Sequence, residues 1–248
     1  PQSFHRDAKR RAIETADAIC CVSHFTLRQL CEFYPSAASK ATVVHHGNSM
    51  SQVAAGTLPE TLRGREFALF VGRRDGYKNF QLLYDAWKRT HSKSGLALVV
   101  VGPAWQPHEL SRVREHRPDE LVLLPDTDDA TLRTLYQSCS CFVFPSHMEG
   151  FGLPALEAMG CGTPMLLSDC DALCEVAGDA GHYFDPSDCD ALCDLLLLSG
   201  QQSLPQQTQK VSKGLQRAAK FQWSRAAAET LEIYRNVHSP SLPYRKAA

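Results

Sequence analysis

The chain has 248 residues, of which 44% are hydrophobic, so it can bury a sizeable core as one large domain or one domain and part of another. Its 26 lysines and arginines nearly balance its 27 aspartates and glutamates, and this net charge of −1, without a basic run, excludes a general nucleic-acid-binding protein. No apolar run approaches the roughly 18 residues of a membrane span, and the polar, basic residues 4–11 lack the apolar centre of a secretory signal. Because the chain begins with Pro1 rather than Met, we expect a fragment whose true N-terminus lies upstream.

Ten cysteines are a high number for this length, yet the chain is too long to be a small disulfide scaffold. We therefore expect reduced, structural thiols in a cytosolic protein. Two C-x3-C pairs, Cys170 with Cys174 and Cys189 with Cys193, leave a four-thiolate zinc site as one alternative. The favoured interpretation is that each pair lies one helical turn apart and packs as small hydrophobic side chains.

The first 50 residues alternate between helix and strand signals, in the order helix 6–16, strand 18–22, helix 26–33 and strand 42–44. Because this order is βαβ-like, residues 1–50 are interpreted as the closing part of an N-terminal α/β domain. Residues 51–64 contain small residues together with Gly56 and Pro59, and are predicted to be a linker.

Residues 65–200 consist of apolar runs separated by amphipathic segments, which is the pattern of a doubly wound parallel sheet. The predicted strands are 67–71, 96–101, 121–124, 141–144 and 164–167, with a candidate sixth at 182–184. Helices are predicted after Asn79 and Asp128, each acting as an N-cap, and from about residues 154, 172 and 189. The expected fold class is therefore α/β, a Rossmann-like doubly wound parallel sheet preceded by a partial second α/β domain.

Residues 201–248 begin with a stretch rich in Gln and Ser, followed by helical segments at 211–221 and 224–237. Their apolar positions are sparse. We therefore expect C-terminal helices that pack back across the surface of the domains.

A basic loop follows the first strand of the 65–200 domain. Gly72 and Gly76 permit tight turns, and Arg73, Arg74 and Lys78 offer planar forks and a point charge to phosphate oxygens. The helix that follows adds the positive end of its dipole. The carboxyl end of a strand is where α/β proteins bind ligands, so we predict a diphosphate site, with a solvated basic turn as the alternative. The loop matches neither the Walker A nor the G-x-G-x-x-G pattern.

An acidic, glycine-rich loop follows the fourth predicted strand of this domain. Gly150 and Gly152 leave backbone N–H groups open, and Pro154 suits the first turn of a helix. Glu149 in the loop and Glu157 in the helix can then face one crevice, where carboxylates accept hydrogen bonds from hydroxyl groups. One basic and one acidic loop together fit a nucleotide sugar. The alternative is a capped helix with an exposed glutamate.

Together the two loops resemble the retaining family 4 (group 1) glycosyltransferases of GT-B fold, in their C-terminal donor-binding domain. The family's Glu-x7-Glu signature is matched by Glu149 and Glu157, and the run at 158–164 resembles its "EAMA-G-P" segment. Arg73 or Arg74, with Lys78, matches the family's phosphate clamp. The resemblance covers most of the chain from residue 15 onward, and residues 1–50 would be the tail of the N-terminal, acceptor-binding domain.

The resemblance implies a catalytic role for Glu149, which would hold the transferred sugar near its anomeric centre. Glu157 would bind the ribose hydroxyls, and Thr127 lies where the family's loop meets the base. The other predicted donor-binding residues belong to the two loops and are Gly72, Arg73, Arg74, Lys78, Gly150, Phe151, Gly152 and Leu153. Because the basic groups and the helix end neutralise the leaving diphosphate, we expect neither a metal ion nor another cofactor.

The implied activity is transfer of a hexose, such as mannose, from a GDP- or UDP-sugar to a glycan or lipid-linked acceptor with retention, in polysaccharide biosynthesis. The missing N-terminal domain is an expected partner, so this chain alone is expected to bind donor without turnover. The expected location is the cytoplasm, either free or on the cytoplasmic face of a membrane. The alternatives are a GT-B phosphorylase or epimerase, and a non-catalytic nucleotide-sugar-binding module.

Overall fold

The computed structural model describes the backbone of residues 2–238, and the side chains there except those of residues 2–5 and 112. Contacts divide the chain into two compact units. The first consists of residues up to 47 together with those from 221 onward, and the second of residues 48–220. The predicted C-terminal segment is therefore divided, because helix α9 (Gln207–Ala218) belongs to the second unit and α10 (Trp223–His238) to the first.

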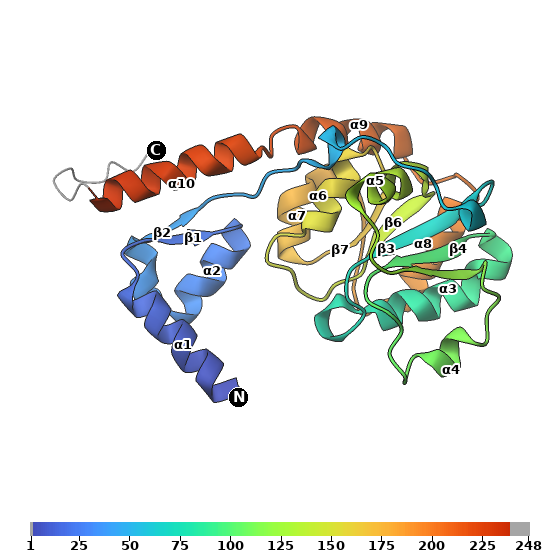
Figure 1. Cartoon of the computed structure of the whole chain (residues 1–248), viewed down its shortest axis with the longest axis horizontal. Coiled ribbons are helices and arrows are strands. Elements are labelled where there is room, and N and C mark those ends of the chain that lie inside the picture. The colour runs from blue at the N-terminus through green and yellow to red at the C-terminus, as the bar shows by residue number, and fades with distance from the viewer. Residues whose placement is uncertain (1, 239–248) are drawn as a thin grey trace. The chain divides into compact units, whose positions relative to one another are not determined.

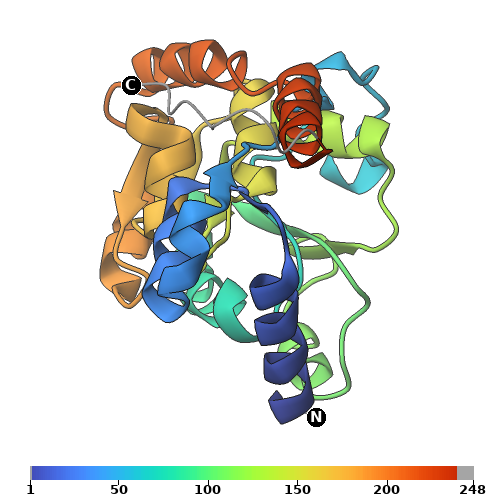
Figure 2. The same cartoon turned by 90° about the vertical axis from the view of Figure 1, so that its left-hand side faces the viewer.

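The first unit contains a two-stranded parallel sheet with a helical crossover. Its elements are α1 (Gln2–Thr15), β1 (Ile19–Cys21), α2 (His24–Phe33), the 3-10 turn η1 (Pro35–Ser39), β2 (Ala41–Val43) and α10. Ser23 begins α2 because its hydroxyl oxygen accepts the Thr26 N–H at 2.9 Å. Strands β1 and β2 pair in parallel, as the βαβ-like order predicts. In Figure 2 the dark blue helix is α1, which leads into β1.

The second unit is built on a six-stranded sheet whose paired strands are all parallel. The strands are β3 (Phe67–Val71), β4 (Ala97–Val101), β5 (Leu121–Leu124), β6 (Cys141–Phe144), β7 (Met165–Ser168) and β8 (Gly181–Phe184). Their spatial order is β5-β4-β3-β6-β7-β8. This is the doubly wound order in which the chain reverses direction between the first and fourth strands, and it confirms the predicted fold class.

Helices cover both faces of this sheet, which is why its strands are continuous apolar runs (Figure 1). On one face α3 (Phe80–Ser94) packs against α8 (Cys189–Gly200), and the short α4 (Leu110–Val113) lies between β4 and β5. On the other face lie α5 (Asp129–Ser138), α6 (Leu153–Gly160), α7 (Asp171–Ala177) and α9. The fully buried Trp87 of α3 belongs to the core on the first of these faces.

The segment predicted as a linker is ordered against the second unit. It forms two 3-10 turns, η2 (Met50–Gln52) and η3 (Glu60–Leu62), which bury Met50 and Leu62. The Asn48 side-chain amide donates to the Leu156 carbonyl oxygen at 3.1 Å. Gly56 lies so close to α5 that a Cβ there would stand 2.8 Å from a backbone carbon of Ala130. Residues 48–64 therefore pack as part of the second unit.

Small residues explain how α9 packs despite its sparse apolar positions. Gly214 and Ala218 are buried, and a Cβ at Gly214 would lie 3.0 Å from Met159 of α6. Within residues 2–238, none of the helices combines the length and the apolar content that crossing a membrane requires.

Candidate functional site

The two predicted loops lie at the carboxyl ends of β3 and β6, the central neighbours in the sheet. The first loop runs from Gly72 through the 3-10 turn η4 (Gly76–Lys78) to Asn79, and the second runs from Pro145 to Gly152. The connections from β3 and β6 leave toward opposite faces, and this is the edge of a doubly wound sheet at which ligands generally bind. The topology therefore brings the basic and acidic loops together as predicted.

Lys78 and Glu149 form an ion pair across the two loops, with 2.9 Å between the Lys78 Nζ and the Glu149 Oε1. Both side chains are largely buried, at 15% and 8% exposure respectively. The ammonium group also lies 4.7 Å from the centre of the Phe144 ring and 5.3 Å from that of Tyr77. This ion pair therefore joins the basic and acidic loops at the strand ends.

Asn79 connects these loops rather than capping the helix, so its predicted role as an N-cap of α3 is wrong. Its backbone adopts the left-handed region at φ 53°, and no side-chain bond caps the helix. The amide instead donates to the carbonyl oxygens of Pro145 at 3.1 Å and Pro186 at 2.8 Å. The His147 N–H donates to the Tyr77 carbonyl oxygen at 2.8 Å, which joins the loops a second time.

The two arginines of the basic loop have different surroundings. The guanidinium of Arg74 forms a bidentate pair with Glu109 and donates to the carbonyl oxygens of Pro103 and Ala104. It also lies 4.3 Å from the centre of the Trp105 ring, and its side chain is only 4% exposed. This pairing lowers the pKa of Glu109.

Arg73, by contrast, is 75% exposed and pairs with Asp75 of the same loop. An exposed pair of this kind contributes little to stability and exchanges partners easily. Arg73 is thus the more available guanidinium for a ligand. A donor-binding role for either arginine stays a prediction.

The acidic loop enters helix α6 through a left-handed glycine. Gly152 has φ 94°, and a Cβ there would lie 2.5 Å from the Leu173 side chain, so this position favours glycine. Leu153 begins α6, Phe151 is buried and Gly150 is exposed. At the first loop Gly72 also has positive φ, at 139°. The loop backbone therefore follows a path that ordinary residues rarely adopt.

Glu157 lies in the second turn of α6 and contacts α5. The Tyr136 hydroxyl donates to the Glu157 Oε2 at 3.1 Å, and Tyr136 is fully buried. Burial raises the pKa of the Glu157 carboxyl, the Tyr136 hydrogen bond opposes that rise, and nearby Asp129 adds to it. Apolar spacing in α5 indicates that Tyr136 is buried, but nothing in the sequence points to its bond with Glu157.

Thr127 lies after β5, where its hydroxyl donates to the Leu124 carbonyl oxygen at 3.0 Å. The next residue, Asp128, caps α5 as predicted, because its carboxylate accepts the Thr131 N–H at 2.7 Å. The contact between Thr127 and a base stays a prediction.

Ser146 and Ser168 form a polar pair at the strand ends that sequence reasoning did not identify. Both are fully buried, at the ends of β6 and β7, and the Ser168 hydroxyl donates to the Ser146 carbonyl oxygen at 2.5 Å. The bond ties the start of the acidic loop to the neighbouring strand. Single serines within loops carry no sequence signal for such a contact.

The four cysteines considered for a zinc site do not converge, so that alternative is wrong. The thiol of Cys193 approaches the Ala86 carbonyl oxygen of α3, whereas that of Cys174 approaches the Asp169 carbonyl oxygen on another part of the sheet edge. In the described part of the chain, no cluster of metal-ligating side chains includes a cysteine. Burial raises the pKa of Cys193 to about 11 and that of Cys141 to about 12, as expected for packed thiols.

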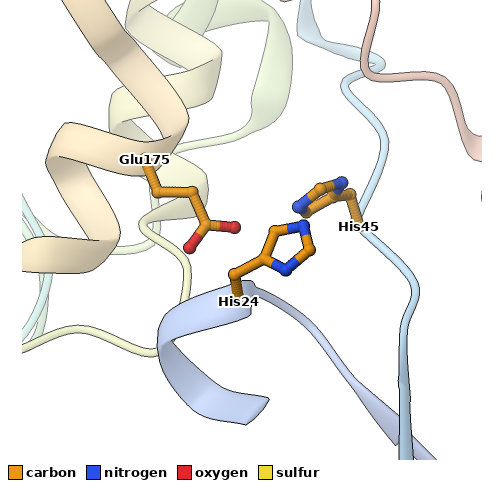
Figure 3. A group of neighbouring side chains, drawn as sticks. All are labelled: His24, His45 and Glu175. Carbon is orange, nitrogen blue, oxygen red and sulfur yellow. The ribbon is translucent and has the colours of Figure 1, made fainter. Parts of the chain in front are cut away.

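The first unit places two histidines where its parallel strands end. His24 begins α2 just after β1, and His45 follows β2; their ring centroids lie 5.7 Å apart (Figure 3). Glu175, drawn in the same figure, belongs to α7 of the second unit. Both histidines line a hollow of about 960 Å³ within the first unit, together with Lys40, Arg225 and other residues of α10. The sequence analysis assigned no role to these side chains.

Residues 60–213 match the sequence model of the family described as "Glycosyl transferases group 1". The chain belongs to the group 1 glycosyltransferases. This group 1 glycosyltransferase is 30% identical over 239 residues to the O-antigen chain mannosyltransferase B of Escherichia coli, with 90% of the chain and 62% of that protein aligned. It is 27% identical over 258 residues to the D-inositol 3-phosphate glycosyltransferase of Kineococcus radiotolerans, covering 92% of the chain and 59% of the relative. The chain thus spans about three fifths of the length of these relatives.

Solved structures of GT-B glycosyltransferases share the fold of this family member. Sucrose-phosphate synthase from Thermosynechococcus elongatus gives a TM-score of 0.75 at 21% identity, covering 94% of this chain and 61% of that one. Anabaena HepE in complex with UDP and glucose gives 0.76 at 19% identity, covering 95% and 68% respectively. At these identities the likeness concerns the fold, which agrees with the predicted GT-B architecture.

Proposed function

We propose that the chain carries the donor site of a retaining hexosyltransferase that takes its sugar from a GDP- or UDP-sugar. The observation that supports this most directly is the buried pair of Lys78 and Glu149. A cation suited to a diphosphate stands 2.9 Å from a carboxylate suited to sugar hydroxyls, so a ligand in which phosphate adjoins a sugar would meet both. The relatives named mannosyltransferases make mannose the favoured sugar.

In the proposed mechanism the bound donor separates Lys78 from Glu149, and each side chain then binds a part of the donor instead. The diphosphate becomes the anionic partner of Lys78, and the sugar hydroxyls become hydrogen-bond donors to Glu149. Lys78, with the exposed Arg73, then stabilises the negative charge that develops on the departing diphosphate. In this scheme Lys78, Arg73 and the start of α6 at Leu153 neutralise that charge without a metal ion.

The remaining predicted residues hold the donor in place. The backbone N–H groups of Gly150, Phe151 and Gly152 face the sugar in this proposal, and Glu157 accepts hydrogen bonds from the ribose. Thr127 lies beside the base. Fixing the anomeric carbon against an acceptor in this way lowers the entropic part of the barrier.

The acceptor and the cellular setting extend the proposal to the whole protein. The relative named for O-antigen chains supports a glycan or lipid-linked acceptor in polysaccharide biosynthesis. We place the enzyme in the cytoplasm or on the cytoplasmic face of a membrane. Because the chain spans 62% of that relative, we infer that it binds donor alone but needs its N-terminal domain for turnover.

Calorimetric titration of the chain with GDP, UDP and ADP tests the donor site. We expect saturable binding of one diphosphate, weakened about tenfold or more by Lys78→Ala, since a charge-assisted hydrogen bond contributes about 1.5–3 kcal/mol. Lys93→Ala, which removes an exposed lysine from α3, is the matched control and should leave the affinity unchanged. If no nucleotide binds even after the N-terminal domain is restored, the proposal is wrong.

Activity assays on the protein with its N-terminal domain restored distinguish an enzyme from the alternatives. A transferase loses turnover on Glu149→Gln while keeping the nucleotide affinity that Lys78 provides. A non-catalytic module shows donor binding but no transfer in the unsubstituted protein. A phosphorylase instead requires inorganic phosphate and releases a sugar phosphate, and an epimerase changes the donor sugar without any acceptor.

A further inference from the structure

Two histidines and a glutamate converge at the edge of the second unit, in a place that the proposed donor site does not use. His91 lies in the last turn of α3, and His116 and Glu120 lie between α4 and β5. One potential ligand atom from each of the three lies within 4.8 Å of the other two. The cluster joins the end of a helix to a segment that is 25 residues further along the chain (116 − 91 = 25).

Each imidazole is held by a protein partner at one ring nitrogen, which leaves the other available. The His91 Nδ1 lies 3.1 Å from the Lys88 carbonyl oxygen. A carbonyl can only accept, so Nδ1 carries the hydrogen and Nε2 carries the lone pair. The His116 Nε2 lies 2.9 Å from the Tyr84 hydroxyl oxygen. When this nitrogen donates to the phenol, the lone pair of His116 is on Nδ1. Metal-binding histidines are oriented by hydrogen bonds of this kind.

Packing on one aromatic residue fixes the orientation of both rings. The centroid of the buried Trp87 lies 4.8 Å from that of His91 and 4.9 Å from that of His116. The two imidazoles are nearly perpendicular, at 87°, with 5.9 Å between their centroids. The site is therefore built on the core rather than on freely rotating surface side chains.

We propose that His91, His116 and Glu120 form a binding site for a divalent transition-metal ion of the zinc type. Two imidazole nitrogens and a carboxylate oxygen are ligands that such ions prefer, and a water molecule completes a tetrahedral set. Ligands about 2.0–2.1 Å from a tetrahedral ion stand roughly 3.3 Å apart, so the three atoms must approach one another further. To make this approach, Glu120 would give up the hydrogen bonds that its carboxylate accepts from the backbone N–H of Arg117 at 3.1 Å and from the Arg117 guanidinium at 3.0 Å.

The bound ion would connect the end of α3 to the segment that leads into β5. It would therefore stabilise the second unit by an amount that rises with the logarithm of the metal concentration, since the unfolded chain does not hold these ligands together. This inference is independent of the proposed glycosyl transfer, because none of the three residues belongs to the donor loops.

The test is a titration of the whole chain with Zn²⁺ alone, followed by calorimetry and by imidazole ¹⁵N NMR. We expect one equivalent to shift the Nε2 resonance of His91 and the Nδ1 resonance of His116. Residue-specific detection matters because the ten cysteines can bind zinc as well. His91→Ala and His116→Ala should each weaken binding at this site by about tenfold or more, because one of three protein ligands is lost.

His108→Ala is the matched control, since His108 is an exposed histidine of the neighbouring segment and should leave the titration unchanged. His116→Ala also removes the hydrogen bond to Tyr84. The zinc affinity of Glu120→Gln therefore tests the site without changing that contact. Unchanged resonances of His91 and His116 at saturating Zn²⁺, or unchanged affinity in both His91→Ala and Glu120→Gln, would overturn the proposal.

Discussion

Arg73 and Arg74 are neighbours in the basic loop, but their side chains have opposite surroundings. Arg74 is surrounded by Glu109, two carbonyl oxygens and the Trp105 ring, whereas Arg73 reaches into solvent beside Asp75. From the sequence alone, Arg73 and Arg74 fit a phosphate clamp equally well. The structure separates them by their existing partners, because a guanidinium whose donors are already used has little left for a ligand.

We therefore expect Arg74→Ala to lower the free energy of unfolding and Arg73→Ala to leave it unchanged. Breaking a buried pair leaves Glu109 uncompensated, at a cost of about 3 kcal/mol, the lower end of the usual range, because Glu109 keeps some access to water. Arg73→Ala should instead weaken diphosphate binding. Urea unfolding and nucleotide calorimetry on both variants measure the two effects. A stable Arg74→Ala protein that fails to bind nucleotide would reverse the assignment.

At the scale of secondary-structure elements, the contact between α5 and α6 bears directly on the candidate site. Tyr136 of α5 donates its hydroxyl hydrogen to Glu157 of α6 from a fully buried position. This bond stabilises the ionised carboxylate, whose pKa is raised by its burial. The bond engages Oε2 of Glu157, and in the proposed function Oε1 accepts the hydrogen bond from the ribose.

Tyr136→Phe should raise the pKa of Glu157 further, because the bond that favours its charged form is lost. The loss of nucleotide affinity on acidification should then begin at a higher pH than in the unsubstituted chain, with about tenfold weaker binding near neutrality. The matched control is Tyr183→Phe, which removes a half-buried hydroxyl that donates to the Gly178 carbonyl oxygen. A purely structural effect would lower affinity by the same factor at every pH.

The regular elements of the second unit could be predicted from the sequence because its strands are buried on both faces. Apart from β8, which contains Gly181 and His182, each strand is a nearly continuous apolar run bounded by turn residues, and the pattern finds all six strands to within one or two residues. The residues at 48–64 were harder to predict. Their small and polar residues indicate a linker, and only the tertiary contacts of Met50 and Leu62 make them part of the core.

Of the candidate site, the sequence predicted the two loops and their place at the sheet edge, but not the side-chain pairs. Lys78 and Glu149 are 71 residues apart, and a local pattern carries no information on which charges meet. The same holds for Asn79, whose type suits a helix cap, whereas its left-handed backbone directs the amide to two loop carbonyls. Long-range hydrogen bonds are set by topology, which a local reading of one sequence does not resolve.

At the scale of the whole molecule, the two units differ in how complete their sheets are. The second unit has six parallel strands with helices on both faces, and the first has two strands in the described residues. The chain spans about three fifths of its relatives' lengths, and the family match at residues 60–213 lies entirely within the second unit. The second unit therefore has a sheet covered on both faces and a core of its own, which makes its stability measurable.

That stability should decrease as the pH is lowered. His182 of β8 is buried, and its Nε2 has no hydrogen-bond partner among the described residues. Burial lowers its pKa, and the ammonium group of Lys210, which donates to the adjacent Gly181 carbonyl oxygen at 2.7 Å, lowers it further. Burial also lowers the pKa of His116 in the same unit.

The direction of this change in the free energy of unfolding follows from proton binding. Below the ordinary histidine pKa of about 6.5 the unfolded chain takes up protons that folded His182 resists, so the free energy of unfolding falls as the pH is lowered from 7 toward 5. His182→Phe removes one such group and keeps a ring in its place, and should make that fall shallower without loss of stability at pH 7. Urea unfolding followed by circular dichroism at each pH measures the slope, with the exposed His108→Ala as the control. An unchanged slope in His182→Phe would show that His182 is protonated as readily in the folded chain as in the unfolded one.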